Sequence, residues 1–393
     1  MTKLLTLALL LTTTFSALAQ KIYTISGVIK DETTGEQLIG ATVKVQGVPK
    51  AGTSSNSYGF YSLSHPAGDW LIEISYIGYA TRTQQVSLYQ NQTLNISLSL
   101  KNALDEVVIK SNKLTNDNVV SPQMGLQKLS MAQINNVPVV LGERDALKTI
   151  ALLPGIKSAG EGNTGFYVRG GASDQNLILL DEATVYNASH LFGFFSTFNS
   201  DAIKDISLYK GSMPAEYGGR LSSVLDIKMN EGNNKAYTLQ GGIGLIASRL
   251  KVEGPIVKNK GSFMVSGRRT YVDLFLKTSS DPDVKDNVLY FYDLNAKANY
   301  HFNDKNAIYL SGYFGKDVLG LKNTFGVDWG NATGTLRFNH VFSSKLFSNT
   351  SFIVSNYNYA VTSFLSDNDF KVTSQITDIN LKEDLQYVAG PNH

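Results

Sequence analysis

A strict alternation of side chains late in the chain limits its fold more than any other feature. From Tyr292 to Phe302 every second residue is apolar or aromatic. The residues between them are Asp293, Asn295, Lys297, Asn299 and His301. A polar turn at 303–306 then leads into a second apolar run. Because successive side chains of a β-strand point to opposite faces, the pattern predicts a strand with one apolar and one polar face.

Two kinds of sheet produce this alternation. A strand of roughly 9–11 residues with lipid on one side and a wet lumen on the other belongs to a membrane barrel. A soluble antiparallel sheet with one covered face also alternates. Tyr292 and Phe302 lie at the two ends of the run and favour the barrel, because its interfacial girdles are aromatic. Leu294 would then face lipid, and Asn295 would face the lumen.

Less regular runs follow at about 334–342, 349–359 and 376–387. We therefore predict that residues 233–393 form the first strands, about seven, of an antiparallel transmembrane β-barrel. Single-chain bacterial barrels have an even number of strands, and eight strands enclose only their own side chains. We therefore expect the chain to be truncated at its C-terminus.

Composition agrees with a mainly β protein. The 393 residues leave room for two or three domains. The chain has 20 Tyr, 19 Phe and 34 Gly against 9 Pro, which suits many strands joined by turns. Its net charge of +2 implies no nucleic-acid partner. The absence of cysteine excludes disulfides, thiolate metal sites and cysteine catalysis.

The first residues have the features of a secretory signal peptide. Lys3 supplies a positive charge, Leu4–Leu11 form an apolar core, and Ala17-Leu18-Ala19 fits a small-x-small cleavage pattern. The apolar core is too short to span a bilayer as a helix, which needs about 20 residues. We predict that residues 1–19 are removed and that Gln20 becomes the N-terminus, so the protein leaves the cytoplasm.

Residues 20–101 alternate apolar and polar positions over short runs separated by turn residues. This pattern predicts a small antiparallel β-sandwich of the immunoglobulin or prealbumin kind. The words SGVIKDETTGEQLIGATVKVQG, SYGFYSL and ISYIGY resemble the carboxypeptidase-regulatory-like domain found ahead of many receptors in Bacteroidota. His65 is the one histidine here. We therefore expect no zinc site and no peptidase activity.

Short strands and paired glycines characterise the segment Phe166–Ile227. The expected strands are Leu177–Leu180, Ile206–Tyr209 and Val224–Ile227. The glycine pairs and their neighbouring arginines are Arg169, Gly170, Gly171, Gly218, Gly219 and Arg220. Paired glycines imply positive φ or close approach of the backbone. Upstream, Asp145 is expected to cap a short helix that runs through Leu153.

The words VRGG, DQNLILLD, LYKG and PAEYGGR resemble the plug domain of TonB-dependent outer-membrane receptors. This resemblance implies an α+β plug at 112–232, inside a barrel. It also places Arg169 and Arg220 where the plug meets the barrel wall, so ion pairs to barrel carboxylates are expected. The family often has Asp-Gly after the LILL run, whereas this chain has Asp181-Glu182. The many glycines and few apolar residues lead us to expect low local stability in the plug.

The connector at 102–111 contains a β-branched run. Glu106, Val107, Val108 and Ile109 resemble a TonB box, the extended segment with which such receptors bind TonB. A β-branched segment outside any domain can add a strand to a partner's sheet edge. The run is equally well interpreted as the first strand of the plug.

The resemblance implies a non-enzymatic importer in the outer membrane, with its N-terminal domain in the periplasm. Its partners would be TonB, membrane lipid and a small ligand: a siderophore, a glycan or a peptide. The plug words differ from those of the glycan-importing branch and favour an iron chelate. A signalling receptor without transport and a soluble adhesion protein are the alternatives. The histidines lack ligand spacing, so no catalytic residue, cofactor or metal is predicted.

Overall fold

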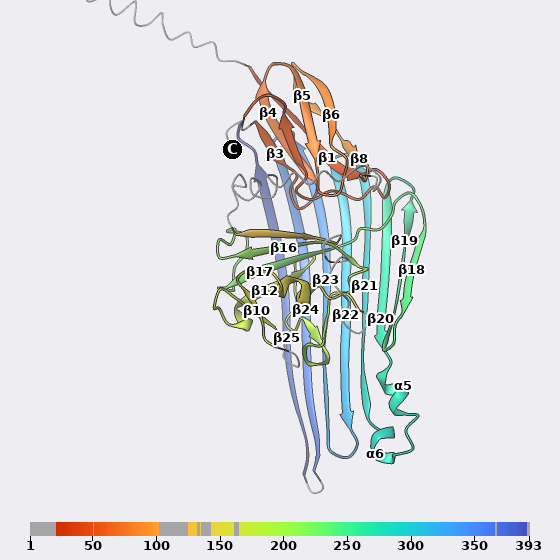
Figure 1. The fold of residues 1–393 in the computed structure, drawn as a ribbon. Helices are drawn as coiled ribbons and strands as arrows, with labels where there is room; N and C mark the ends of the chain where they lie inside the picture. Colours follow the sequence, from red (N-terminus) through yellow and green to blue (C-terminus); the bar gives the residue numbers. More distant parts are fainter. Residues whose placement is uncertain are drawn as a thin grey trace, which may run out of the picture.

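The computed structural model describes residues 21–49, 51–101, 125–131, 134, 143–160, 165–365 and 368–390. The predicted signal peptide and the predicted TonB box lie outside these residues. The described chain is mainly β, as predicted, and forms two small domains against one large sheet (Figure 1). None of its short helices has the length and apolar character that a membrane crossing requires.

The N-terminal domain, residues 21–101, is a sandwich of two four-stranded sheets. One sheet has the order β4-β1-β7, with β8 also paired to β1, and the other has the order β3-β2-β5-β6. Its strands are β1 (Ile22–Asp31), β2 (Thr42–Val45), β3 (Gly52–Ser54), β4 (Phe60–Pro66), β5 (Gly68–Ser75), β6 (Arg82–Leu88), β7 (Gln92–Thr93) and β8 (Ile96–Leu98). The prediction of a wholly antiparallel sandwich is wrong, because β7 and β8 run parallel to β1. Alternation along one strand carries no information about the direction of its neighbour.

The central domain, residues 125–232, is built on a mixed sheet of order β13-β12-β17-β16-β9. These strands are β9 (Leu126–Ser130), β12 (Asn176–Leu180), β13 (Ala183–Thr184), β16 (Ile203–Lys210) and β17 (Ser223–Met229). The three strands predicted between 177 and 227 are thus present. Ile206, Leu208, Leu225 and Ile227 are fully buried at the centre of one large apolar cluster. The expected shortage of core residues is therefore wrong.

Smaller elements surround this sheet. They are α4 (Ala146–Ala151), β10 (Ile156–Ser158), β11 (Phe166–Val168), η1 (Ser173–Gln175), β14 (Ser189–His190), η2 (Leu191–Gly193) and β15 (Phe195–Ser196). Asp145 caps α4 as predicted, because its carboxylate accepts the Lys148 N–H at 3.0 Å. The other Asp145 oxygen accepts the Ser196 N–H at 2.7 Å, so the cap also fixes the β14–β15 hairpin.

The large sheet, called the wall below, is an antiparallel meander that curves around the central domain (Figure 1). Its strands are β18 (Thr238–Ile243), β19 (Ala247–Val257), β20 (Gly261–Thr270), β21 (Val288–Asn303), β22 (Asn306–Leu321), β23 (Phe325–Ser343), β24 (Leu346–Leu365) and β25 (Asn368–Tyr387). The described wall has eight strands, not about seven.

The wall has two unlike ends. The N-terminal domain covers one end, where short turns join β21 to β22 and β23 to β24. The opposite end carries the longer β20–β21 connection with helices α5 (Val272–Leu276) and α6 (Pro282–Lys285) (Figure 1). The central domain lies on the concave face between these ends.

Candidate functional site

The two faces of the wall change character partway along its long strands. From the N-terminal domain outward, the convex face of β25 presents Leu385, Glu383, Leu381, Ile379, Thr377, Gln375, Thr373 and Lys371. Over the same distance the concave face presents Gln386, Asp384, Lys382, Asn380, Asp378, Ile376, Ser374, Val372 and Phe370. Strands β23 and β24 change in the same sense. The concave face is therefore polar near the N-terminal domain and apolar at the far end.

The polar half of the concave face is buried against the central domain. Asn295, predicted to face a lumen, does lie on this face but is only 2% exposed. Leu294 lies on the convex face and is 48% exposed, as predicted. These concave side chains therefore contact the central domain instead of water. The charged side chains among them consequently need partners of opposite charge.

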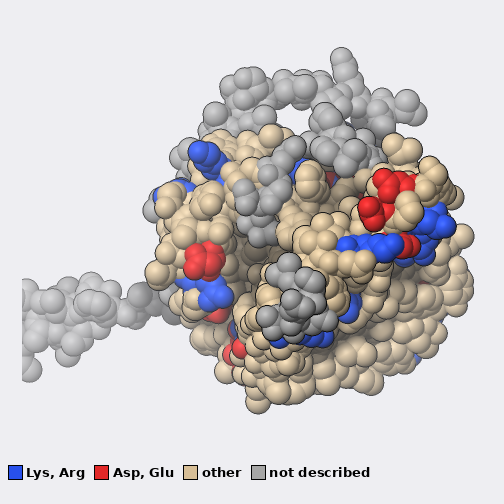
Figure 2. Space-filling view, turned by 90° about the horizontal axis from the view of Figure 1, so that it is seen from below, with Lys and Arg blue, Asp and Glu red and all other residues tan. Residues whose placement is uncertain are grey.

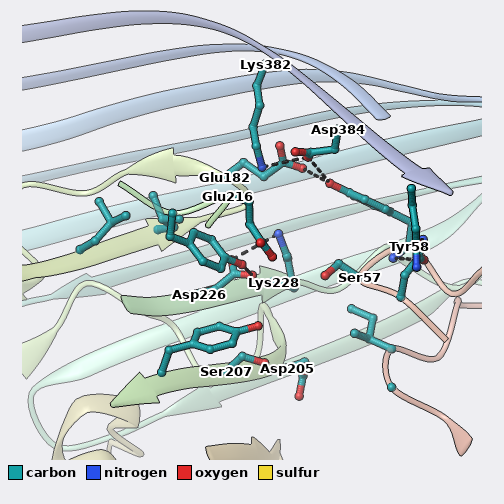
Figure 3. Close-up of a pocket in the computed structure, with 18 of the residues that line it drawn as sticks. Ser57, Tyr58, Glu182, Asp205, Ser207, Glu216, Asp226, Lys228, Lys382 and Asp384 are labelled. Atoms are coloured by element: carbon teal, nitrogen blue, oxygen red, sulfur yellow. Dashed lines mark hydrogen bonds and ion pairs between the residues drawn. The ribbon is translucent and has the colours of Figure 1, made fainter. Parts of the chain in front are cut away.

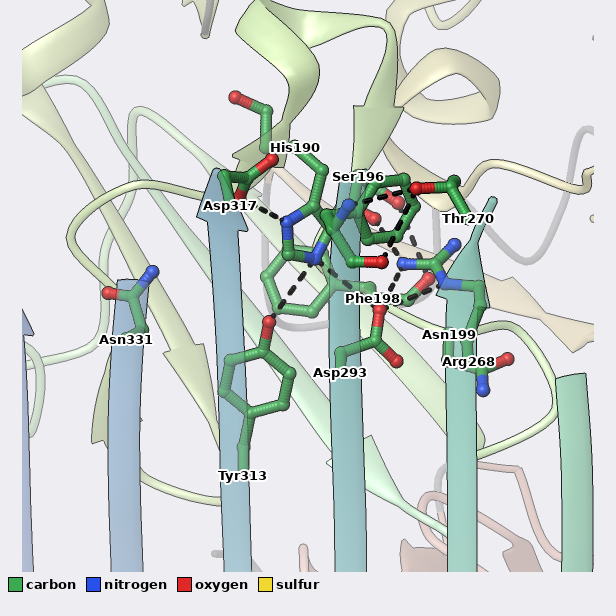
Figure 4. A network of polar contacts seen from close by, with 12 residues as sticks. His190, Ser196, Phe198, Asn199, Arg268, Thr270, Asp293, Tyr313, Asp317 and Asn331 are labelled. Carbon is green, nitrogen blue, oxygen red and sulfur yellow. Dashed lines mark hydrogen bonds and ion pairs between the residues drawn. The ribbon is translucent and has the colours of Figure 1, made fainter. Parts of the chain in front are cut away.

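The first group of buried partners, here called the histidine cluster, consists of His190, Arg268, Asp293, Asp317 and Glu143. His190 comes from β14 and contacts carboxylates of two wall strands, through Nδ1 to Asp317 at 2.6 Å and through Nε2 to Asp293 at 3.4 Å (Figure 4). Arg268 donates to Asp293 at 2.6 Å and approaches Glu143 of the central domain at 3.7 Å. Each domain thus supplies both cations and anions to one buried site.

The environment favours the charged form of His190. Burial alone would lower its pKa. The carboxylates of Asp317 and Asp293 outweigh burial and raise the pKa of His190 above its ordinary value. The Leu191 N–H also donates to Asp317 at 2.8 Å, so the loop after His190 is held by the same carboxylate.

The second group, here called the lysine cluster, consists of Asp181, Glu182, Lys297 and Arg337. Asp181 and Glu182 form the tight turn between β12 and β13, both with positive φ, 46° and 75°. Lys297 lies 2.9 Å from Asp181, and Arg337 lies 3.6 Å from Glu182. A glycine would fit the second turn position without strain. The carboxylate at this position instead gives the wall arginine a partner.

Neighbouring cations keep both carboxylates of this turn charged. Burial alone would raise the pKa of Asp181, but Lys297 and Arg337 outweigh it and lower that pKa. Burial is likewise outweighed at Glu182, where Lys228 and Arg337 lower the pKa. Both carboxylates are therefore ionised inside the molecule, and their attachment to the wall is ionic.

Beyond the histidine cluster, aromatic side chains gather between the central domain and the apolar half of the concave face. Phe192 lies over Trp329 with ring centroids 4.8 Å apart, and Tyr186 faces Tyr357 at 6.4 Å. Phe192 is 40% exposed, on a segment with positive φ. We call this group, with the neighbouring Ile376, the vestibule. Seen from the end away from the N-terminal domain, most of the described surface is uncharged (Figure 2).

Near the N-terminal domain, a cavity of about 830 Å³ separates the central sheet from β25. Tyr58 of the N-terminal domain reaches into its edge, beside Glu182 and Asp384 (Figure 3). Lys382 pairs with Asp384 at 2.9 Å, and Lys228 pairs with Asp226 at 3.2 Å. All three parts of the described chain therefore meet at this cavity.

Comparison with known families assigns two of these parts. A family model for the CarboxypepD_reg-like domain matches residues 25–109. A family model for the TonB-dependent receptor plug domain matches residues 126–223. Residues 126–223 therefore match the plug domain of TonB-dependent receptors. The central domain is called the plug from here on.

Solved structures share the fold at low sequence identity. The siderophore receptor PirA from Acinetobacter baumannii superposes with a TM-score of 0.51 and 15% identity, over 67% of this chain and 45% of that receptor. The ferric enterobactin receptor PfeA from Pseudomonas aeruginosa gives 0.49 and 13%, over 69% and 47%. The copper transporter OprC gives 0.47 and 13%, over 67% and 42%. The chain thus spans less than half the length of these proteins. No curated protein matches the sequence.

The glycine pairs of the plug occupy special positions only in part. Gly170 has a φ of 85°, and a Cβ on Gly171 would lie 2.4 Å from the Ser222 hydroxyl. Gly219 also has positive φ, whereas Gly218 has neither constraint. Both glycines of the pair Gly170-Gly171 therefore meet the expectation of positive φ or close approach. In the pair Gly218-Gly219 only Gly219 does.

The expected arginine pairs are not found in the described residues. Arg169 is exposed, and Arg220 donates to the adjacent Gly219 carbonyl at 2.8 Å. No ion pair of the described chain includes either residue. Wall residues Arg268 and Arg337 serve this purpose instead, with partners that include the plug carboxylates Glu143 and Glu182.

Sequence reasoning missed both clusters. One signal was available: Asp293, Lys297 and Arg337 stand at polar positions of strongly alternating strands, so each had to face the inside. Which plug residue meets each of them depends on how the plug sits in the wall, and no local pattern encodes that.

Proposed function

We propose that the protein is an energised outer-membrane importer, in which TonB pulls on the plug to admit a scarce small ligand such as an iron–siderophore complex. The observation that carries this proposal is the plug held to the wall by buried charge pairs. A seal made only of apolar packing would need no such pairs. Ionic contacts, in contrast, can exchange their partners for water when force draws the plug aside.

The wall supports placement in a membrane. On β25 the mainly apolar part of the convex face covers Ile379–Tyr387, nine residues, and its one charged side chain, Glu383, accepts a hydrogen bond from the Thr350 hydroxyl. At a rise of 3.3 Å and the usual tilt, nine residues give roughly 23 Å, close to the apolar band of about 25 Å in bacterial barrels. We infer that the N-terminal domain lies on the periplasmic side, because the longer β20–β21 connection is at the opposite end and such barrels carry their longer loops on the extracellular side.

The vestibule supports the kind of ligand. Its side chains are aromatic or apolar, and Phe192 is 40% exposed. Stacking on Phe192 and Tyr357 would favour a ligand with flat aromatic groups, such as a catecholate chelate of iron. The structural similarity to PirA, a siderophore receptor, is consistent with choosing an iron chelate as the probe.

Uptake of radiolabelled iron supplied as ferric enterobactin tests the proposal. We expect accumulation that disappears when TonB is deleted. Val107→Pro should abolish uptake, because proline removes a strand hydrogen bond from the segment Glu106–Ile109. Thr115→Pro, outside the predicted TonB box, is the matched control and should import normally. Binding without TonB-dependent accumulation would indicate a signalling receptor, and uptake of glycan or peptide probes alone would indicate the other import classes.

A further inference from the structure

The edge strand β4 of the N-terminal domain is buried on both faces. Tyr61 and Leu63 belong to the core of the domain itself. Phe60 and Ser62 lie on the opposite face and meet the wall. Phe60 stacks on Phe347 with centroids 5.3 Å apart, and the Ser62 hydroxyl donates to the Ser344 carbonyl at 2.7 Å. In a free domain, the face of β4 that carries Phe60 and Ser62 would be exposed to water. Here the wall covers that face.

Tyr58 joins all three parts of the chain. Its hydroxyl lies 3.2 Å from Glu182 of the plug and 3.3 Å from Asp384 of the wall (Figure 3). The Arg337 guanidinium lies 4.9 Å from its ring and also pairs with Glu182. Next to it, the Asn56 amide donates to Gln386 at 2.7 Å. The plug turn therefore cannot move away without breaking a contact to the N-terminal domain.

A second attachment holds the link between the plug and the first wall strand. The Glu36 carboxylate accepts the Glu231 N–H at 2.6 Å and the Gly232 N–H at 3.0 Å. The Asn234 N–H donates to the Thr34 carbonyl at 2.9 Å. Gly35 permits this approach, because a Cβ there would lie 2.3 Å from the Asn234 amide. The turn at 31–37 is thus shaped to the link at 230–235.

We propose that the N-terminal domain is a latch, which holds the plug in place and must undock from the wall before the plug can move. This proposal rests on the proposed function and names its regulation. The connector at 102–124 joins the last latch strand, β8, to the first plug strand, β9. A pull applied to this connector is therefore transmitted along the chain to the latch on one side and to the plug on the other.

Thiol labelling tests whether the latch is docked and what releases it. The chain has no cysteine, so Ser62→Cys gives a single thiol beneath the latch. Ser87→Cys, exposed on β6, is the matched control. In cells lacking TonB, the full chain with Ser62→Cys should react with a small maleimide at least about tenfold more slowly than the control. Adding Tyr58→Ala should raise the Ser62→Cys rate and leave the Ser87→Cys rate unchanged. Equal rates for the two thiols would overturn the proposal.

A reducible cross-link tests whether undocking is required. Asn56→Cys with Gln386→Cys places one thiol on the latch and one on the wall, joined by a short bis-methanethiosulfonate. Uptake of iron as ferric enterobactin should fall at least about tenfold when cross-linked and return on reduction. Undiminished uptake by the cross-linked receptor would refute the latch. If the receptor without cross-link shows no TonB-dependent uptake, the proposed function fails, and the labelling rates still decide whether the latch docks.

Discussion

At the scale of single residues, the buried lysine cluster makes a sharp prediction. Lys297→Met leaves Asp181 ionised and without its nearest cation. Breaking one side of a buried pair costs about 3–5 kcal/mol, so urea should release the plug at a lower concentration. The double variant Asp181→Asn with Lys297→Met should recover most of this loss, because asparagine tolerates positive φ and carries no charge. Limited proteolysis across a urea series measures it, and a double variant no better than the single one would contradict it.

His190 makes the attachment of the plug depend on pH. Its pKa is raised in the folded protein by Asp317 and Asp293, although burial opposes this. The stability it contributes is therefore complete below its ordinary pKa, about 6.5, and is lost as pH rises through the higher folded value. His190→Gln should remove that part of the dependence. Thermal unfolding of both proteins from about pH 6 to pH 9 checks this, and parallel curves would count against it.

At the scale of elements, β24 carries a matched pair of convex positions. Phe352 lies in the apolar half and is 47% exposed, whereas Asn358 lies in the polar half. Phe352→Arg should reduce assembly, with a cost of about 2–4 kcal/mol near the bilayer midplane, and Asn358→Arg should assemble normally. Heat-modifiable mobility of membrane-extracted protein reports the difference. Equal assembly of both variants would mean that the convex face does not contact lipid.

The same strand shows how far sequence patterns reach. The alternation at 349–359 predicts the middle of β24, and the structure extends the strand to Leu346–Leu365. The residues added at the far end were missed because the alternation there has the opposite sense, with Val361 on the concave face and Thr362 on the convex face. Where the apolar positions of a strand move from one face to the other, the alternation is interrupted. A search for one continuous alternation then places the end of the strand at that point. The exact pairing of the strands came from the structure alone.

At the scale of the whole molecule, the plug has a substantial core rather than the loose interior that its glycines suggested. Ile206, Leu208, Leu225 and Ile227 are each fully buried. Without TonB, we expect the amides of β16 and β17 to exchange hydrogen as slowly as those of the central wall strands. Hydrogen exchange with mass spectrometry measures this. Fast exchange in β16 would instead show that the plug opens by local unfolding even before any pull.

The change of faces along β25 also has a consequence for where the protein first meets its surroundings. Ten residues, from Asn368 to Thr377, lie beyond the apolar band of the convex face. In the proposed membrane placement, at the usual rise and tilt, they would extend roughly 25 Å past the lipid, as a collar with a polar convex face and an apolar concave face. In this collar the apolar face is the concave one, whereas nearer the N-terminal domain the apolar face is the convex one. An apolar molecule from the medium would leave water there, well before it reaches the depth of the membrane.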